Sequence, residues 1–146
     1  MKRAERRAQI IGAATRAFAA RGYAATGLED VAAAAGVTRA LLYRHFSSKS
    51  DLYRAVLARA RARLEGLDGV PGLVPAAAAD PDGFRVLFRH AVWEAEFSDA
   101  VAGLLPTVTF EAVLAWLDVG QPDPDQAADR ISRVVAAVAA LPVPPT

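Results

Sequence analysis

Alanine is the feature that most constrains the fold of this sequence. The chain of 146 residues contains 34 alanines, and nearly all of them lie in stretches without proline. Alanine has the highest helix propensity because its side chain loses no conformational freedom when a helix forms. Alternating apolar and polar runs rich in β-branched residues, which predict strands, are absent. We therefore expect an all-α protein.

The first half of the chain contains signals for four helices. Apolar residues recur at helical spacing from Ile10 to Phe18. Thr26 with Glu29 fits a capping box at the start of a second helix, and Thr38 is suited to cap a third. We expect these helices at residues 3–20, 28–35, 38–45 and 49–65.

Glycine and proline cluster directly after the fourth expected helix. Five such residues within 66–75 predict a loop or linker. We therefore divide the chain into an N-terminal unit of residues 4–64 and a C-terminal unit of residues 65–146. In the C-terminal unit, Asp-Pro pairs at Asp80 and Asp123 are suited to start helices. The expected elements there are a helix over 80–97, a short turn to 105, a helix over 106–117 and a last helix over 123–141.

The formal net charge of +1 conceals two halves of opposite sign. Residues 1–65 contain 13 Lys and Arg against 5 Asp and Glu, a balance of +8. Residues 66–146 contain 4 against 11, a balance of −7. Such an asymmetry favours a nucleic acid or another anionic surface as the partner of the basic half.

Several functional classes are excluded by missing residue types or patterns. The chain has no cysteine and only two histidines, so disulfides and thiolate metal sites are excluded. His90 and Glu94 are four residues apart on an expected helix, but further ligands have no evident place, and we expect no metal. Because no nucleophile and base are paired and no glycine-rich phosphate loop is present, we expect neither an enzyme nor a cofactor. No apolar run approaches the roughly 18 residues that cross a bilayer, and we expect a cytoplasmic protein whose mature chain starts at Met1.

Two short helices separated by Ala35-Gly36-Val37 have the form of a helix-turn-helix. Residues such as Val31 and Leu42 must pack on the neighbouring helices. The second helix then presents its remaining residues outward: Thr38, Arg39, Ala40, Tyr43 and Arg44. Arginine and tyrosine beside small residues suit entry into the major groove of B-DNA.

Four spaced motifs between Ile10 and Leu57 carry a specific resemblance. They read AAxxxF, GYxAT, DVAxxAGV and LYRHFxSKxDL in chain order. This stretch resembles the DNA-binding domain of the TetR family of transcriptional regulators, and the resemblance covers roughly residues 4–64. It implies an N-terminal three-helix domain joined by a long fourth helix to a small helical domain for dimerisation and effector binding.

The resemblance also implies roles for individual residues. It implies a homodimer that binds double-stranded DNA at an inverted repeat, represses transcription and releases DNA when a small molecule binds. Arg39 and Ala40 would face base edges, and Tyr43 would reach a base or the backbone. The residues implied at phosphates are Thr26, Tyr43, His45 and Lys49. The residue after Thr26 is glycine where the family more often has Thr or Ser, so Thr26 would both cap the helix and contact phosphate.

Each of these residues has a structural alternative. The ring of Tyr43 would alternatively pack on the fourth helix, and Thr38 would serve only as a helix cap. His45 would alternatively form a hydrogen bond within the motif. We expect the N-terminal Lys and Arg residues to form a solvated arm that adds nonspecific attraction, and we expect Lys49 to be exposed near a helix start and close to a phosphate.

Residues 106–141 are the expected dimer interface, because the last helix combines a wide apolar face with small alanines. These helices would alternatively close only the core of the monomer. The C-terminal unit is short for the family, so an effector pocket would be small, shared between subunits or absent, and its residues are unknown. The competing function is a helical interaction protein whose basic half binds an anionic surface without reading DNA sequence.

Overall fold

The computed structural model describes residues 2–104, 107–142 and 145, and within them every regular element is a helix. The expected all-α class is thereby confirmed. The elements are α1 (Arg3–Arg21), α2 (Leu28–Ala35), α3 (Arg39–His45), α4 (Lys49–Ala62), α5 (Gly69–Ala79), α6 (Pro81–Arg85), a π-helical turn η1 (Val86–His90), the 3₁₀ turns η2 (Ala91–Trp93) and η3 (Ser98–Ala100), α7 (Thr107–Asp118) and α8 (Pro124–Ala139).

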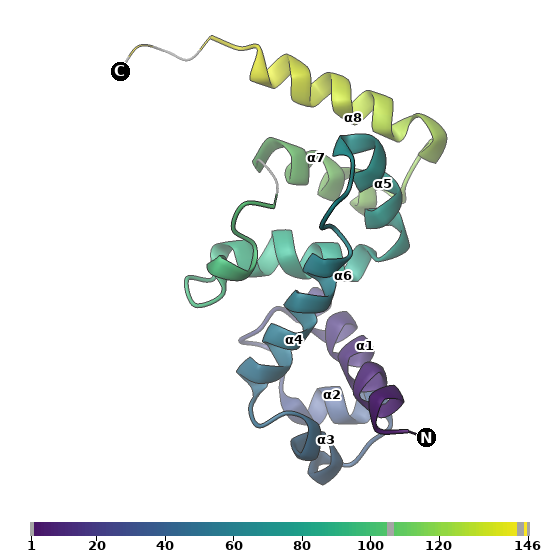
Figure 1. Cartoon of the computed structure of the whole chain (residues 1–146), viewed down its shortest axis with the longest axis vertical. Coiled ribbons are helices and arrows are strands. Elements are labelled where there is room, and N and C mark those ends of the chain that lie inside the picture. Colours follow the sequence, from purple (N-terminus) through teal and green to yellow (C-terminus); the bar gives the residue numbers. More distant parts are fainter. Residues whose placement is uncertain (1, 105–106, 143–144, 146) are drawn as a thin grey trace.

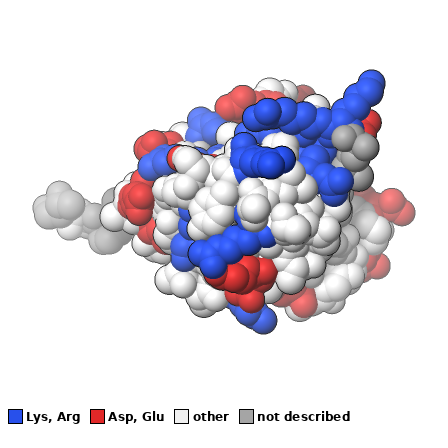
Figure 2. Space-filling view, turned by 90° about the horizontal axis from the view of Figure 1, so that it is seen from below, with Lys and Arg blue, Asp and Glu red and all other residues white. Residues whose placement is uncertain are grey.

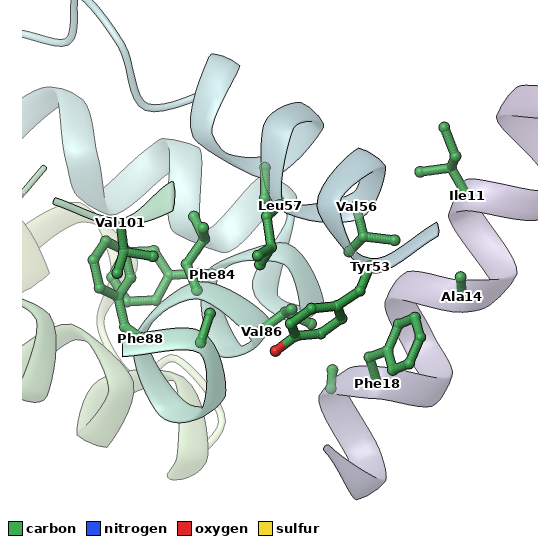
Figure 3. Packing of buried hydrophobic residues seen from close by; sticks show 14 of the residues in the cluster. Ile11, Ala14, Phe18, Tyr53, Val56, Leu57, Phe84, Val86, Phe88 and Val101 are labelled. Carbon is green, nitrogen blue, oxygen red and sulfur yellow. The ribbon is translucent and has the colours of Figure 1, made fainter. Parts of the chain in front are cut away.

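The helices form two tiers that are connected by α4 (Figure 1). One tier holds α1, α2 and α3, and the other holds the helices from α5 to α8. One continuous core of buried apolar residues runs through both tiers. In Figure 3, Tyr53 of α4 lies between Phe18 of α1 and Val86 of η1. The rings of Phe18 and Tyr53 meet edge to face with their centres 4.8 Å apart.

The predicted loop over 66–75 is wrong, because α5 occupies most of it. Pro71 lies in the first turn of α5, where a helix needs no N–H donor. Pro75 lies inside the helix, but Leu73 and Val74 beside it are buried against the core. Burial of this apolar face outweighs the local preference of glycine and proline. The predicted fourth helix is correspondingly too long, because α4 ends at Ala62.

The helix predicted over 80–97 has a different form in the structure. Asp80 caps it as expected, since its carboxylate accepts a hydrogen bond from the Gly83 N–H at 3.2 Å. The helix then widens into the π-helical turn η1, tightens into η2 and ends at Trp93. A π turn admits one extra residue per turn, and Val86, Leu87 and Phe88 are all buried by it. An apolar pattern with a period of 3.6 residues predicts a regular α-helix, so it does not predict this change in the number of residues per turn.

The last two helices agree closely with their predicted bounds. The predicted start of α7 at Pro106 lies outside the described residues, and α8 starts at Pro124 as expected. Asp123 occupies the predicted N-cap position, but its carboxylate accepts no hydrogen bond from the start of the helix and pairs with Arg130 at 3.1 Å instead. The expected short turn before Leu105 is represented by η3, while Leu105 itself lies outside the described residues.

Polar contacts hold α4 to the segment 94–102 of the other tier. Tyr53 donates to the Glu94 carboxylate at 3.2 Å. Arg54 donates to the carbonyl oxygen of Glu96 at 3.1 Å. Arg61 donates to the carbonyl oxygens of Ala100 and Ala102 at 2.9 and 3.2 Å. Four hydrogen bonds thus join α4 to this segment.

Candidate nucleic-acid interface

A tight turn at Gly36 sets the angle between α2 and α3. Gly36 has a φ of +68°, a left-handed conformation in which side chains other than glycine are strained. A Cβ atom at this position would meet no atom within 4 Å, so glycine is needed here for its backbone rather than for space. The N–H of Val37 donates to the carbonyl oxygen of Ala32 at 3.0 Å and completes the end of α2.

Helix α3 has one buried face and one face open to solvent. Leu42 is fully buried, and Phe46 directly after the helix is also buried. Thr38 caps α3 as predicted, because its hydroxyl accepts the Leu41 N–H at 3.1 Å. The residues exposed on the open face are Thr38, Arg39, Ala40, Tyr43 and Arg44. The positions predicted to pack inward are thus buried, and those predicted to face outward are exposed. Tyr43 is 42% exposed.

The guanidinium group of Arg39 contacts one acidic and one aromatic neighbour. It pairs with the Glu29 carboxylate of α2 at 2.6 Å and lies 5.6 Å from the centre of the Tyr43 ring. A hydrogen bond with Tyr43 and the charge of Glu29 raise the pKa of Arg39, so the group stays cationic. Both partners are solvent-exposed, and exposed pairs of this kind exchange readily for stronger contacts. Arg39 is therefore available to a ligand at the open face of α3.

Thr26 and Lys49 do not have the predicted exposure. Thr26 is 1% exposed and its hydroxyl donates to the carbonyl oxygen of Gly22 at 2.8 Å, so its side chain is not available to a phosphate. The predicted cap at Thr26 is also wrong, because the N-cap of α2 is Gly27. Lys49 is half-buried and donates to the carbonyl oxygen of Tyr23 at 2.9 Å. Its ammonium group thus links the start of α4 to the loop that precedes α2.

The N-terminal arginines lie on the first turns of α1, which is helical from Arg3 onward as expected, and Arg3 and Arg7 are exposed to solvent. Arg3 and Arg6 line a hollow of about 340 Å³ together with Leu41, Arg44 and His45 of α3. Desolvation, followed by the charges of Arg3, Arg7 and Arg6, lowers the pKa of His45. Figure 2 shows this end of the molecule, where Lys and Arg side chains gather in groups around the exposed surface. The sequence contains these charges, but only the fold brings the start of α1 and the residues of α3 to one hollow.

His90 and Glu94 have separate structural roles. The Nε2 atom of His90 lies 3.0 Å from the carbonyl oxygen of Ala19, at the end of α1. Glu94 accepts the hydrogen bond from Tyr53. Within residues 2–104, 107–142 and 145, no three His, Cys, Asp or Glu side chains gather as metal ligands would. In the same part of the chain, no helix has the length and apolar character needed to cross a bilayer.

Comparison with known families and proteins finds similarity to transcriptional regulators. Residues 10–56 match the family described as bacterial regulatory proteins, tetR family. The HTH-type transcriptional activator FasR of Mycolicibacterium smegmatis is 51% identical over 59 residues, which are 40% of this chain and 27% of that protein. The HTH-type transcriptional repressor Rv3405c of Mycobacterium tuberculosis is 42% identical over 89 residues, which are 60% of this chain and 47% of that protein. The chain thus spans between about a quarter and half of the length of these relatives.

Solved structures share the fold over nearly the whole chain. A TetR-like transcriptional regulator from Rhodococcus sp. RHA1 has a TM-score of 0.74 and 22% identity, covering 97% of this chain and 100% of that one. A tetR-family transcriptional regulator from Streptomyces coelicolor has a TM-score of 0.56 and 22% identity, covering 95% of this chain and 82% of that one. At this identity the likeness concerns the fold alone.

Proposed function

Because residues 10–56 place this chain in the tetR family of bacterial regulatory proteins, we propose that it regulates transcription by binding an inverted-repeat operator as a homodimer. The observation that carries the proposal is the open face of α3, which presents two arginines and a tyrosine above a fully packed inner face. A helix with this division of faces fits the major groove of B-DNA. Since its target is chromosomal DNA, the proposed place of action is the cytoplasm of a bacterial cell.

The proposed roles along α3 follow from side-chain chemistry. Arg39 is suited to donate two hydrogen bonds to O6 and N7 of a guanine. Ala40 offers only a methyl contact, for instance to a thymine. Tyr43, Arg44 and His45 are assigned to the backbone or to base edges, and Thr38 lies exposed at the helix start. For Thr26 a phosphate contact is no longer proposed, because its hydroxyl donates within the protein. Lys49 is still assigned to a phosphate, because its one hydrogen bond to Tyr23 leaves two further ammonium N–H donors and its side chain is only half-buried.

The proposed dimer interface lies within residues 106–141. Only Ala127 and Ile131 of α8 are buried, whereas Val134 and Val138 further along the helix are 51% and 42% exposed. In Figure 1, α8 lies along the top edge of the molecule, and its C-terminal part leads away from α5. A second copy that covers this apolar stripe around a two-fold axis would form a helical bundle and set the spacing of the two α3 helices.

We further propose repression that is relieved by a small molecule. A hollow of about 270 Å³ in the C-terminal tier is lined mainly by apolar residues, namely Leu64, Leu67, Gly69, Val70, Leu73, Leu104 and Thr109. This lining favours a small, largely apolar effector. The protein would have two arrangements that differ in where α4 lies. An effector that binds one arrangement more tightly than the other would change the separation of the α3 helices in the dimer. The contacts between α4 and segment 94–102 support such a coupling.

Selection from a random duplex library tests the proposed function. We expect the purified full chain to select an inverted repeat and to bind it at least about a thousandfold more tightly than random DNA at the same salt concentration. A protein that only binds anionic surfaces would recover no common sequence and would bind all duplexes with similar affinity. That result would contradict the proposed function.

A further inference from the structure

A basic hollow lies beside α3, outside the face that we assign to base reading. Its walls come from the first two turns of α1 and from α3. The lining residues are Arg3, Arg6, Leu41, Arg44 and His45, and none of them is acidic. The side chain of Arg6 donates to Gln9 at 3.3 Å, a neutral partner that leaves its charge uncompensated. Three arginines and a histidine therefore converge without a carboxylate among them.

A second hollow continues from the first along the same end of the molecule. It has a volume of about 620 Å³ and shares Arg44 and His45 with the first. Arg7 and Arg54 also line it, and its one carboxylate, Asp51, is hydrogen-bonded by Ser47. The basic residues thus form a band that crosses α3 rather than a closed pocket for one ion.

We propose that Arg3 and Arg6 of α1, together with Arg44 and His45, bind the phosphodiester backbone of the operator beside the bases that α3 reads. This proposal rests on the proposed function and adds a contact outside the recognition helix. The band fits a polyanion because each strand of B-DNA carries one negative charge for every 3.4 Å of helix axis. Backbone contacts of this kind fix the register of the protein on DNA without reading sequence. The helical start of α1 makes the contact rigid, whereas a flexible arm would lose conformational entropy on binding.

The double variant Arg3→Gln/Arg6→Gln tests this contact. Gln keeps the helix propensity of Arg and removes the charge. We expect affinity for the selected operator to fall about tenfold or more near physiological salt. The slope of log K against log salt should become shallower by about 3 to 4 for four lost contacts in a dimer. The sequence selected from a random library should stay the same, because the lost contacts are to phosphates.

The matched control is Arg16→Gln/Arg21→Gln on the same helix. These exposed arginines line a different hollow between α1 and α2, and about ten residues of helix, some 15 Å, separate Arg6 from Arg16. We expect the control to bind within about twofold of the wild type with an unchanged salt slope. Equal slopes for both double variants would overturn the proposed contact. Failure of the proposed function is a separate result, because the wild type itself would then select no operator.

Proton uptake by His45 gives an independent prediction. The charged groups that face its two sides are Arg3, Arg6 and Arg7 of α1, Arg44 of α3, and Asp51 and Arg54 of α4. The pKa of His45 is lowered in the free protein, first by desolvation and then by the charges of Arg3, Arg7 and Arg6. A bound phosphate would offset the arginine charges and raise that pKa, so DNA binding would take up a proton.

Affinity is therefore expected to increase as the pH falls from about 8 to 6, by up to tenfold for each unit by which the pKa differs between the free and bound states. The affinity gain is complete below the pKa of the free protein and is lost as the pH rises through the pKa of the complex. Binding measured by fluorescence anisotropy across this range should lose its slope in His45→Gln. A variant that keeps the full pH dependence would show that His45 does not contact the backbone.

Discussion

Replacing Val134 and Val138 with aspartate is expected to convert the protein into a monomer and to weaken operator binding at least about a thousandfold. Both valines lie on the apolar stripe of α8 beyond the part that its own core covers. Two carboxylates in the proposed interface would lose their hydration without a partner, which costs several kcal/mol each. A monomer also loses the second half-site, whose binding is intramolecular in the dimer. Sedimentation and fluorescence anisotropy measure the two effects.

Arg133→Asp is the matched control for the α8 variant. It changes the net charge by the same two units on the same helix, but Arg133 is exposed and lies away from the valine stripe. We expect this control to remain dimeric and to bind the operator within a few fold of the wild type. The control should unfold at a temperature close to that of the wild type. The aspartate variant should stay folded but unfold at a lower temperature, because it loses the stabilisation that dimerisation gives to the folded state. A dimeric aspartate variant would show that the interface lies elsewhere.

Arg39→Ala is expected to remove the preference for one base pair in each half-site. An arginine bound to guanine through two hydrogen bonds contributes roughly 5- to 150-fold in discrimination at one position. Since the dimer uses two half-sites, the loss in affinity for the selected operator should approach the square of this factor. A second selection from the random library, performed with the variant, should show one relaxed position per half-site while the remaining positions persist.

Arg16→Ala controls for the loss of charge in this experiment. It removes one exposed positive charge from the same tier without touching α3. Its selected sequence should match that of the wild type. An unchanged sequence preference in Arg39→Ala would contradict the assigned base contact. The fold should be intact in both variants, because the Arg39 side chain contacts only the exposed Glu29 and Tyr43 among its charged and aromatic neighbours within the described residues.

The helix-turn-helix could be predicted from the sequence because its signals are local. Gly36 ends α2 through its own backbone conformation, and Thr38 caps α3 through a contact three residues away. The bounds of α2 agree with prediction, and α3 starts directly after its predicted cap. Signals of this kind act within one turn of a helix. All the residues that take part are therefore neighbours in the sequence, and the signal can be recognised there.

The differences between prediction and structure come from contacts between residues that are far apart in the sequence, which local patterns do not predict. Helix α5 forms despite Pro71 and Pro75 because its apolar face is buried by other helices. Lys49 reaches the carbonyl oxygen of Tyr23, which is 26 residues earlier, and is therefore partly buried. Arg3 and His45, which are 42 residues apart in the sequence, line the same hollow because the fold places the start of α1 near α3. Such proximities are determined by tertiary packing, so sequence spacing alone does not show them.

The hydrogen bonds from Arg54 and Arg61 to segment 94–102 end on main-chain oxygens, whereas the longer ion pair of Arg54 with Asp99 at 3.8 Å ends on a side chain. Every amino acid supplies the same carbonyl group, so the acceptors remain when the side chains of this segment are exchanged. Substitutions in this segment therefore change its side chains while the hydrogen bonds from the two arginines of α4 stay in place.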